Sequence, residues 1–133
     1  MSPTPETVIG FDFGLKRIGV AIGNTLSASA RPLTIIREES NDRKFAAIEA
    51  LLKEWQPAFA VVGLPRYPDG TPHEMTAHCR KFANRLNGRF GIRTIHVDER
   101  YSSTVLNFRR GESDDAHAAA IILQQYFDEQ MSV

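Results

Sequence analysis

The sequence predicts an α/β fold, in which helices pack on the faces of a mixed sheet of five strands. Three strand patterns follow one another over residues 7–37, and from residue 41 onward helical patterns alternate with apolar strand patterns. Strands that follow each other directly form an antiparallel meander, whereas strands separated by a helix pair in parallel. The two halves together therefore imply a mixed sheet.

Each strand is predicted from its own apolar pattern. Residues 7–13 are rich in Val, Ile and Phe, residues 17–23 alternate large and small side chains, and residues 33–37 form a third short run. Residues 59–64 are wholly apolar, which is typical of a central strand covered on both faces. Residues 92–97 form the last predicted strand.

The helices are predicted from apolar residues at helical spacing. The first covers residues 41–55 and ends before Pro57. Residues 71–74, with the sequence Thr-Pro-His-Glu, match a capping box with proline at the first helical position, so we expect the second helix to begin there. The third helix is predicted from near residue 114 to about residue 129.

Composition indicates a single globular domain. The 133 residues suffice for a core, and the shares of apolar and charged residues are those of an ordinary soluble protein. The longest apolar runs are too short to cross a membrane, and the first residues lack the pattern of a signal peptide. The single cysteine, Cys79, fits a reducing compartment. We therefore expect a cytoplasmic protein without a membrane partner.

The net charge gives little sign of a nucleic-acid partner. Sixteen basic and sixteen acidic residues cancel, whereas nucleic-acid binders usually carry a basic excess. Basic residues do gather in residues 80–93 and 100–110, and we interpret most of them as solvated surface charge.

Asp12 stands out because it places a carboxylate at the end of the first apolar run. Gly14 follows it and permits a tight turn or a close backbone approach to a ligand, and Lys16 and Arg17 bring positive charge beside it. This combination suits a metal ion together with a phosphate. A plain hairpin with Asp and Gly in its turn explains the local pattern equally well.

Two further acidic pairs lie where they can converge on Asp12. Asp98 and Glu99 end the last strand, and Asp114 and Asp115 open the final helix. Carboxylates around one point repel each other, so convergence would call for a cation, and oxygen ligands alone suit Mg²⁺ or Mn²⁺ rather than Zn²⁺. Each pair also has a structural explanation, an ion pair with the arginine that follows for the first and helix capping for the second.

Other kinds of catalytic site find no support in the sequence. His73, His78, His96 and His117 do not have the spacing of a zinc site, and neither a G-x-S-x-G serine nor a G-x-x-x-x-G-K-[ST] phosphate loop occurs. His117 is close enough to the acidic pair to assist a water molecule, although a structural role is the simpler interpretation.

Four motifs together resemble the YqgF family, whose members are described as Holliday junction resolvases and as pre-16S rRNA nucleases. The motifs are DFGLKRIGVA at residues 12–21, VGLP at 62–65 with DGT at 69–71, DERYSS at 98–103 and DAHAAAIIL at 115–123. They occur in the family's order and span nearly the whole chain. The resemblance implies a ribonuclease H-like fold, which agrees with the predicted order of elements.

The resemblance also implies a metal-dependent nuclease whose catalytic and metal-binding residues are Asp12, Glu99 and Asp115. In such sites two Mg²⁺ or Mn²⁺ ions, about 3.5–4 Å apart, hold the scissile phosphate. Asp12 would bridge the two ions, and the other two carboxylates would complete the ligand shells. One ion would activate the attacking water, and the other would stabilise the leaving oxygen.

Basic residues near these carboxylates are the expected substrate contacts. Lys16, Arg17 and Arg100 would neutralise phosphates near the centre. Arg66 and the backbone N–H groups of residues 71–74 would hold a further phosphate at the start of the second helix.

The expected activity is cleavage of structured RNA at the 5′ end of pre-16S rRNA during ribosome biogenesis, with a ribosome precursor as partner. One alternative is resolution of four-way DNA junctions. Another is nucleotide-phosphate binding, since residues 12–19 also resemble the first phosphate loop of actin-like ATPases, although this chain has no second lobe to close over a nucleotide. A third is non-catalytic RNA binding in ribosome assembly, against which the intact acidic set argues.

One departure from the family bears on this choice. Family members usually carry a longer, basic segment between Ser103 and Asp114, where this chain has only residues 104–113. The short connection leaves little chain to wrap a junction, and the apolar stripes all serve one core. We therefore expect a monomer or weak homodimer that makes single cuts in RNA, whereas a resolvase needs a two-fold dimer.

Overall fold

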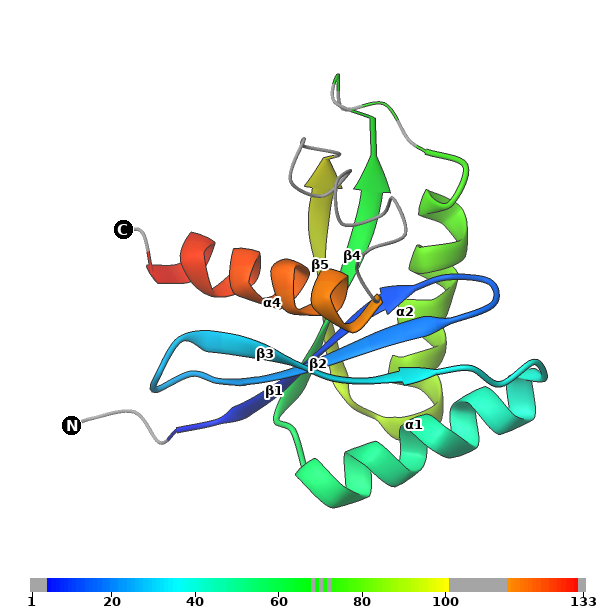
Figure 1. Ribbon diagram of the computed structural model, residues 1–133, viewed down its shortest axis with the longest axis horizontal. Helices are drawn as coiled ribbons and strands as arrows, with labels where there is room; N and C mark the ends of the chain where they lie inside the picture. Colours follow the sequence, from blue (N-terminus) through cyan, green and yellow to red (C-terminus); the bar gives the residue numbers. More distant parts are fainter. Residues whose placement is uncertain (1–4, 68, 70, 72, 101–114, 132–133) are drawn as a thin grey trace.

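The computed structural model describes residues 5–67, 69, 71, 73–100 and 115–131. The strands are β1 (Thr7–Phe13), β2 (Ile18–Asn24), β3 (Ser29–Ile36), β4 (Phe59–Arg66) and β5 (Arg93–Arg100), and the helices are α1 (Asn41–Trp55), α2 (Thr76–Phe90) and α4 (Asp115–Met131). The strands form one sheet in the order β3-β2-β1-β4-β5. Helix α4 crosses one face of the sheet, and α1 and α2 lie on the other (Figure 1).

The sheet is mixed, as the sequence predicts. Strand β2 pairs in antiparallel fashion with both β1 and β3, whereas β4 pairs in parallel with both β1 and β5. The central strand, β1, therefore joins the meander to the parallel half. Because β1, β4 and β5 run in the same direction, their carboxyl ends meet at one edge of the sheet, the edge where α/β folds place their ligands.

Strand β1 is buried on both faces, and its side chains alternate between two cores. Ile9 and Phe11 pack against α1 and α2, together with Phe45 and Phe82, which those helices contribute. Val8, on the opposite face, packs against α4. This alternation follows from the two-residue period of a strand, and it fixes which residues of β1 face which helix.

Helix α4 lies unusually close to the sheet because glycines of β1 and β2 face it. A Cβ atom at Gly10 would stand 3.0 Å from the Cβ atom of Leu123 on α4. A Cβ atom at Gly19 would overlap the backbone carbonyl of Asp115, the first residue of the helix. The small residues of the sheet thus position the amino-terminal end of α4.

Local signals set the bounds of α1 as the sequence predicts. The Ser40 hydroxyl accepts a hydrogen bond from the backbone N–H of Arg43. The helix ends at Trp55, and its C-cap, Gln56, adopts a left-handed backbone conformation before Pro57. No described helix is both long and apolar enough to cross a membrane.

Three predicted boundaries were wrong. Helix α2 begins at Thr76 rather than in residues 71–74, and its N-cap, Met75, makes no side-chain capping bond. Strand β3 begins at Ser29, before the apolar run that predicted it, because its pairing with β2 extends over polar residues. Strand β5 continues past Val97 to Arg100, since its ladder with β4 extends to that residue.

Candidate active site

Asp12 lies next to the last residue of β1, on the face that α4 covers. It is opposite Gly19 in the antiparallel ladder with β2, and directly opposed residues share a face of the sheet. The residue is buried, with an exposed fraction of only 8%. A carboxylate in this position is costly unless hydrogen bonds or a positive charge compensate it.

Asp115 is brought beside Asp12 by the packing at Gly19. The Asp115 carbonyl occupies the space that a Gly19 side chain would need, so the first turn of α4 rests on the residue opposite Asp12. An acidic residue in the first turn also suits the helix dipole. Two of the three predicted catalytic residues are therefore neighbours in the structure, although they are 103 positions apart in the sequence.

Arg17 supplies positive charge to this pair. Its Nε lies 3.0 Å from Oδ2 of Asp115, and the Asp115 side chain is more buried than that of Arg17, with exposed fractions of 29% and 57%. We predicted Arg17 as a phosphate contact; the structure places it within the acidic site itself. Lys16, its neighbour in the turn between β1 and β2, is exposed.

Glu99 is placed by its backbone, at the carboxyl end of β5. It pairs with Pro65 of β4 in the parallel ladder, and Arg66 pairs with Arg100 one position further. The side chains of Glu99, Arg66 and Arg100 lie outside the described part of the structure, as does Asp114.

The end of β5 is tied to α4 through Asp98. The side-chain amide of Gln125 donates a hydrogen bond to the backbone carbonyl of Asp98, at 3.0 Å. The Asp98 side chain itself is exposed. Helix α4 therefore contacts β2 at Gly19, opposite Asp12, and β5 at Asp98, next to Glu99.

The phosphate site predicted at residues 71–74 was wrong in its geometry, because α2 does not begin there. The backbone N–H groups of Thr71 and His73 already donate to the side chains of Asp69 and Thr76, and that of Met75 donates to the ring of His73. These groups stabilise the turn itself. The sequence pattern of a capping box gave no indication that Thr76 would anchor the helix instead.

The carboxylates of this site suit a hard divalent cation. Asp12 and Asp115 offer oxygen donors alone, the kind that Mg²⁺ and Mn²⁺ prefer. Within the described residues, no group of three histidine, cysteine or acidic side chains is arranged around one point. A third protein ligand would have to come from beyond the described side chains, and Glu99 is the candidate that the fold places at the same edge.

Two solved structures share this architecture. RuvC of Thermus thermophilus, in complex with a Holliday junction substrate, superposes with a TM-score of 0.58 at 17% identity, over 95% of this chain and 96% of that one. The fowlpox virus resolvase, in complex with Holliday junction DNA, gives 0.59 at 10% identity, over 94% and 99%. At these identities the likeness shows the ribonuclease H-like fold and confirms that prediction.

Two curated relatives are each 52% identical to this chain. The protein of Burkholderia ambifaria (strain MC40-6), which bears the name "Putative pre-16S rRNA nuclease", matches over 138 residues that cover 96% of this chain and 93% of its own. The protein of Paraburkholderia xenovorans (strain LB400) bears the same name and matches over 128 residues, 92% of this chain and 88% of its own.

The family model described as "RuvX: Holliday junction resolvase" matches residues 6–129. The match includes all five strands and nearly all of α4, and the two relatives cover 96% and 92% of the chain. The chain therefore belongs to the RuvX family, also called YqgF, a family of nucleases that hydrolyse phosphodiester bonds.

Proposed function

We propose that this protein is a metal-dependent nuclease that cuts structured RNA, with the 5′ end of pre-16S rRNA as its substrate. One observation carries the assignment of the site: a buried acidic residue, Asp12, lies one position before the end of the central strand, beside Asp115 at the start of α4. Its burial next to a second carboxylate is the arrangement expected where a cation is bound.

Asp12, Asp115 and Glu99 form the proposed catalytic set. Glu99 follows Val97 by two positions along β5, and Val97 packs against α4. By the two-residue period of a strand, Glu99 would belong to that same face of the sheet. All three residues would then lie on the α4 face at the edge where β1 and β5 end, and this shared position supports the set.

The carboxylates of these residues would hold the metal, with Asp12 the least exposed of the described donors. A divalent ion bound there would activate a water molecule and stabilise negative charge on the phosphate oxygens. Asp12 is held in place by the ladder of β1 with β2, and Asp115 by the contact of α4 with Gly19. Both proposed ligands would therefore be held on rigid elements, as a precise catalytic site requires.

Arg17 has two roles in this proposal. Without a bound cation it neutralises Asp115, at 3.0 Å. When a cation takes over that charge, the guanidinium becomes available to a phosphate, for which its paired N–H donors are suited. Lys16, exposed in the same turn, and Arg66 and Arg100, at the ends of β4 and β5, are the other proposed phosphate contacts.

The names of the relatives favour RNA as the substrate. Proteins 52% identical to this chain are named pre-16S rRNA nucleases, whereas the junction-bound structures are related only through the fold. Resolution of four-way DNA junctions is the second candidate, and the description of the family model favours it. We propose a monomer or weak dimer in the cytoplasm, acting on a ribosome precursor.

A cleavage assay separates these candidates. The substrates are a pre-16S rRNA fragment with its 5′ leader, a four-way DNA junction and plain duplexes of each kind, with Mg²⁺, Mn²⁺ or chelator. We expect single cuts in the RNA that require the metal and that Asp12→Asn abolishes. Paired symmetric cuts in the junction, made by a stable dimer without RNA cleavage, would establish the second candidate instead.

Metal binding is tested independently of activity. Titration with Mn²⁺, followed by calorimetry, should show binding to the wild-type protein that is weakened at least about tenfold in Asp115→Asn, because a ligand is lost. Asp128→Asn, at the far end of the same helix, is the matched control and should bind as the wild type does. Equal binding by all three proteins would contradict the proposed ligand set.

A further inference from the structure

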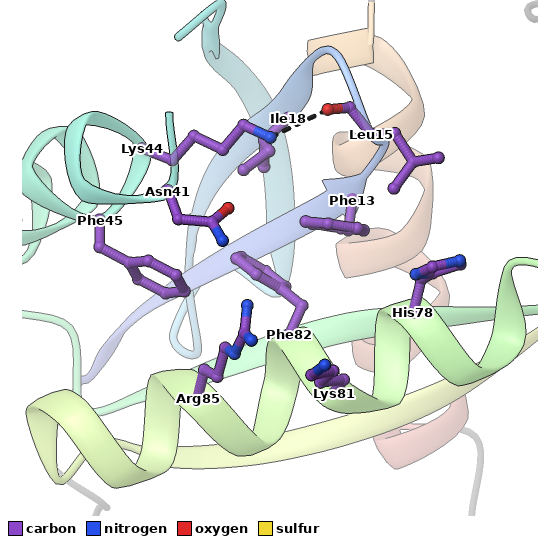
Figure 2. A pocket seen from close by; sticks show the side chains of 10 residues that line it. All are labelled: Phe13, Leu15, Ile18, Asn41, Lys44, Phe45, His78, Lys81, Phe82 and Arg85. Carbon is purple, nitrogen blue, oxygen red and sulfur yellow. Dashed lines mark hydrogen bonds between the residues drawn. The ribbon is translucent and has the colours of Figure 1, made fainter. Parts of the chain in front are cut away.

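A second site is suggested by a pocket on the opposite face of the sheet from Asp12. It has a volume of about 240 Å³ and lies between the amino-terminal end of α1, the middle of α2 and the end of β1. Figure 2 shows Lys44, His78, Lys81 and Arg85 around it, with the rings of Phe13 and Phe82 between them. Of the ten described residues that line the pocket, none is acidic.

Lys44 is the unusual member of this group, because it is a buried residue and no acidic side chain among the described residues pairs with it. Its exposed fraction is 8%. Among the described residues, its ammonium group has only one partner, the backbone carbonyl of Leu15 at 2.9 Å, which is neutral (Figure 2). An ammonium group has three protons to donate, so two remain for another acceptor. A buried charge without a counter-charge is costly, so an anion bound beside Lys44 would be favourable.

The surrounding charge reinforces this conclusion. Helix α2 carries four basic residues and no acidic ones along its length. Lys81 and Arg85 are four positions apart, which places both on the same side of the helix, and both line the pocket. In Figure 2 Arg85 extends from α2 toward α1, on the same side as the buried lysine. The pocket therefore combines one buried and two exposed cations around a space smaller than the usual site for a drug-sized ligand, about 300–1,000 Å³.

The position of the pocket relative to Asp12 bears on which anion would bind there. Phe13 lines the pocket and directly follows Asp12 in β1, and consecutive residues of a strand point to opposite faces. The turn between β1 and β2, which carries Lys16 and Arg17, lies between the two sites. A nucleic-acid strand that passes over this turn can reach both faces at the same sheet edge. Phe13 and Phe82 stack on each other, with ring centroids 4.7 Å apart, and add an apolar wall beside the cations.

We propose that this pocket binds a backbone phosphate of the substrate strand, other than the phosphate that is cut. Lys44, Lys81 and Arg85 provide the charge, and His78 borders the entrance. The inference rests on the proposed function for the identity of the strand. For the anion it rests on the charge of Lys44, which no acidic side chain among the described residues pairs with. The two sites would then hold one strand across the edge of the sheet, with the chemistry on one face and an anchoring phosphate on the other.

Binding measured without cleavage tests this proposal. A fluorescent pre-16S rRNA fragment is titrated in chelator, at several salt concentrations, with the wild type, with the double variant Lys81→Gln/Arg85→Gln and with Arg80→Gln. Arg80 is the matched control because it is exposed on the same helix but does not line the pocket. We expect the double variant to bind about three- to tenfold more weakly, with a salt slope about one unit flatter, and Arg80→Gln to change affinity less than about twofold.

The proposal would be overturned if RNA affinity fell by the same amount per charge removed in the double variant and in Arg80→Gln. That result would show only a diffuse basic surface.

The same variants in the cleavage assay separate this failure from failure of the proposed function. If the wild type cleaves RNA and the double variant binds RNA as well as Arg80→Gln does, the phosphate site is excluded and the proposed nuclease function stands. If the wild type cleaves none of the substrates and the double variant loses affinity for RNA, the proposed nuclease function is excluded and the phosphate site stands.

Thermal unfolding with inorganic phosphate tests the anion itself. Phosphate should raise the Tm of the wild type, and Lys44→Met should remove that rise. Lys44→Met should fold with similar or greater stability in the absence of phosphate, because an apolar chain of similar length replaces a buried charge. A phosphate effect on the wild type that RNA does not compete with would show that the pocket takes a free anion, and the assignment to the strand would be wrong.

Discussion

The two faces of the sheet differ in both packing and charge. The α4 face is covered by one helix that approaches closely over glycines, and this helix carries three acidic residues and no basic ones. The other face is covered by two helices over an aromatic core, and α2 carries four basic residues and no acidic ones. The formal net charge of zero hides this separation. Neutrality of the whole chain therefore does not argue against a nucleic-acid partner when the charges are segregated by face.

The largest expected effect comes from removing the charge of Asp12. Asp12→Asn should slow cleavage by at least about a hundredfold, because a buried metal ligand is lost. Stability should stay the same or rise, since the substitution relieves repulsion from Asp115. Rates under single-turnover conditions and chemical unfolding measure the two quantities. Full activity in this variant would exclude Asp12 as a ligand.

The next largest effect is expected at Gly19, on the α4 face of the sheet, and Gly88, in α2 on the other face, is its comparison. Gly19→Ala should destabilise the protein by about 1–3 kcal/mol or more, because the new methyl group meets the backbone of Asp115. Gly88→Ala, in α2, has open space around it and should stabilise the helix by about 0.5–1 kcal/mol. Urea denaturation of both variants checks the prediction. A Gly19→Ala protein as stable as the wild type would show that α4 does not rest on this residue.

A smaller effect is expected from Arg17. Because its ion pair with Asp115 is half exposed, Arg17→Gln should lower stability by less than about 1 kcal/mol, and salt should reduce the difference. The same substitution should tighten Mn²⁺ binding, since the guanidinium no longer competes for the Asp115 carboxylate. Weaker Mn²⁺ binding would mean that Arg17 supports the metal site rather than competing with the metal.

The smallest effect concerns the pH dependence of stability on the α2 side. Partial burial lowers the pKa of His96 below its ordinary value of 6.5, nearby Arg80 lowers it further, and Asp98 acts in the opposite sense. The unfolded chain therefore binds a proton more readily than the folded protein. Stability should fall as the pH drops from above 6.5 toward the lowered pKa, and His96→Gln should reduce this slope. An unchanged slope in the variant would assign the dependence to other groups.

The fold could be predicted largely from local patterns. The bounds of β1 and α1 agree with the apolar run and the capping residues that define them. The start of α2 could not be predicted, because residues 71–74 match a capping box while the side chain of Thr76 accepts from His73 and donates to the carbonyl of Pro65. That choice depends on the packing of α2 against β4, which a short motif does not contain.

The candidate site was predictable in its residue types but not in its partners. Asp12 and Asp115 were identified from a strand end, a helix start and the family motifs, and the structure makes them neighbours. The ion pair of Arg17 with Asp115 could not be predicted from the sequence, because it depends on how α4 packs on the sheet. The pocket around Lys44 likewise depends on the packing of α1 against α2. The basic residues of α2 are visible in the sequence, and we interpreted them as solvated surface charge. No local sequence pattern shows that Lys44 of α1 is buried beside them.

The most direct test of the division between the two faces is a single-turnover cleavage assay over a range of enzyme concentrations. Asp12→Asn and Lys81→Gln/Arg85→Gln are compared with the wild type on the RNA that the wild type cuts. The account predicts that Asp12→Asn loses the maximal rate and keeps its affinity for RNA, and that the double variant keeps the maximal rate and loses affinity. Loss of maximal rate in both variants, with affinity unchanged in both, would contradict it.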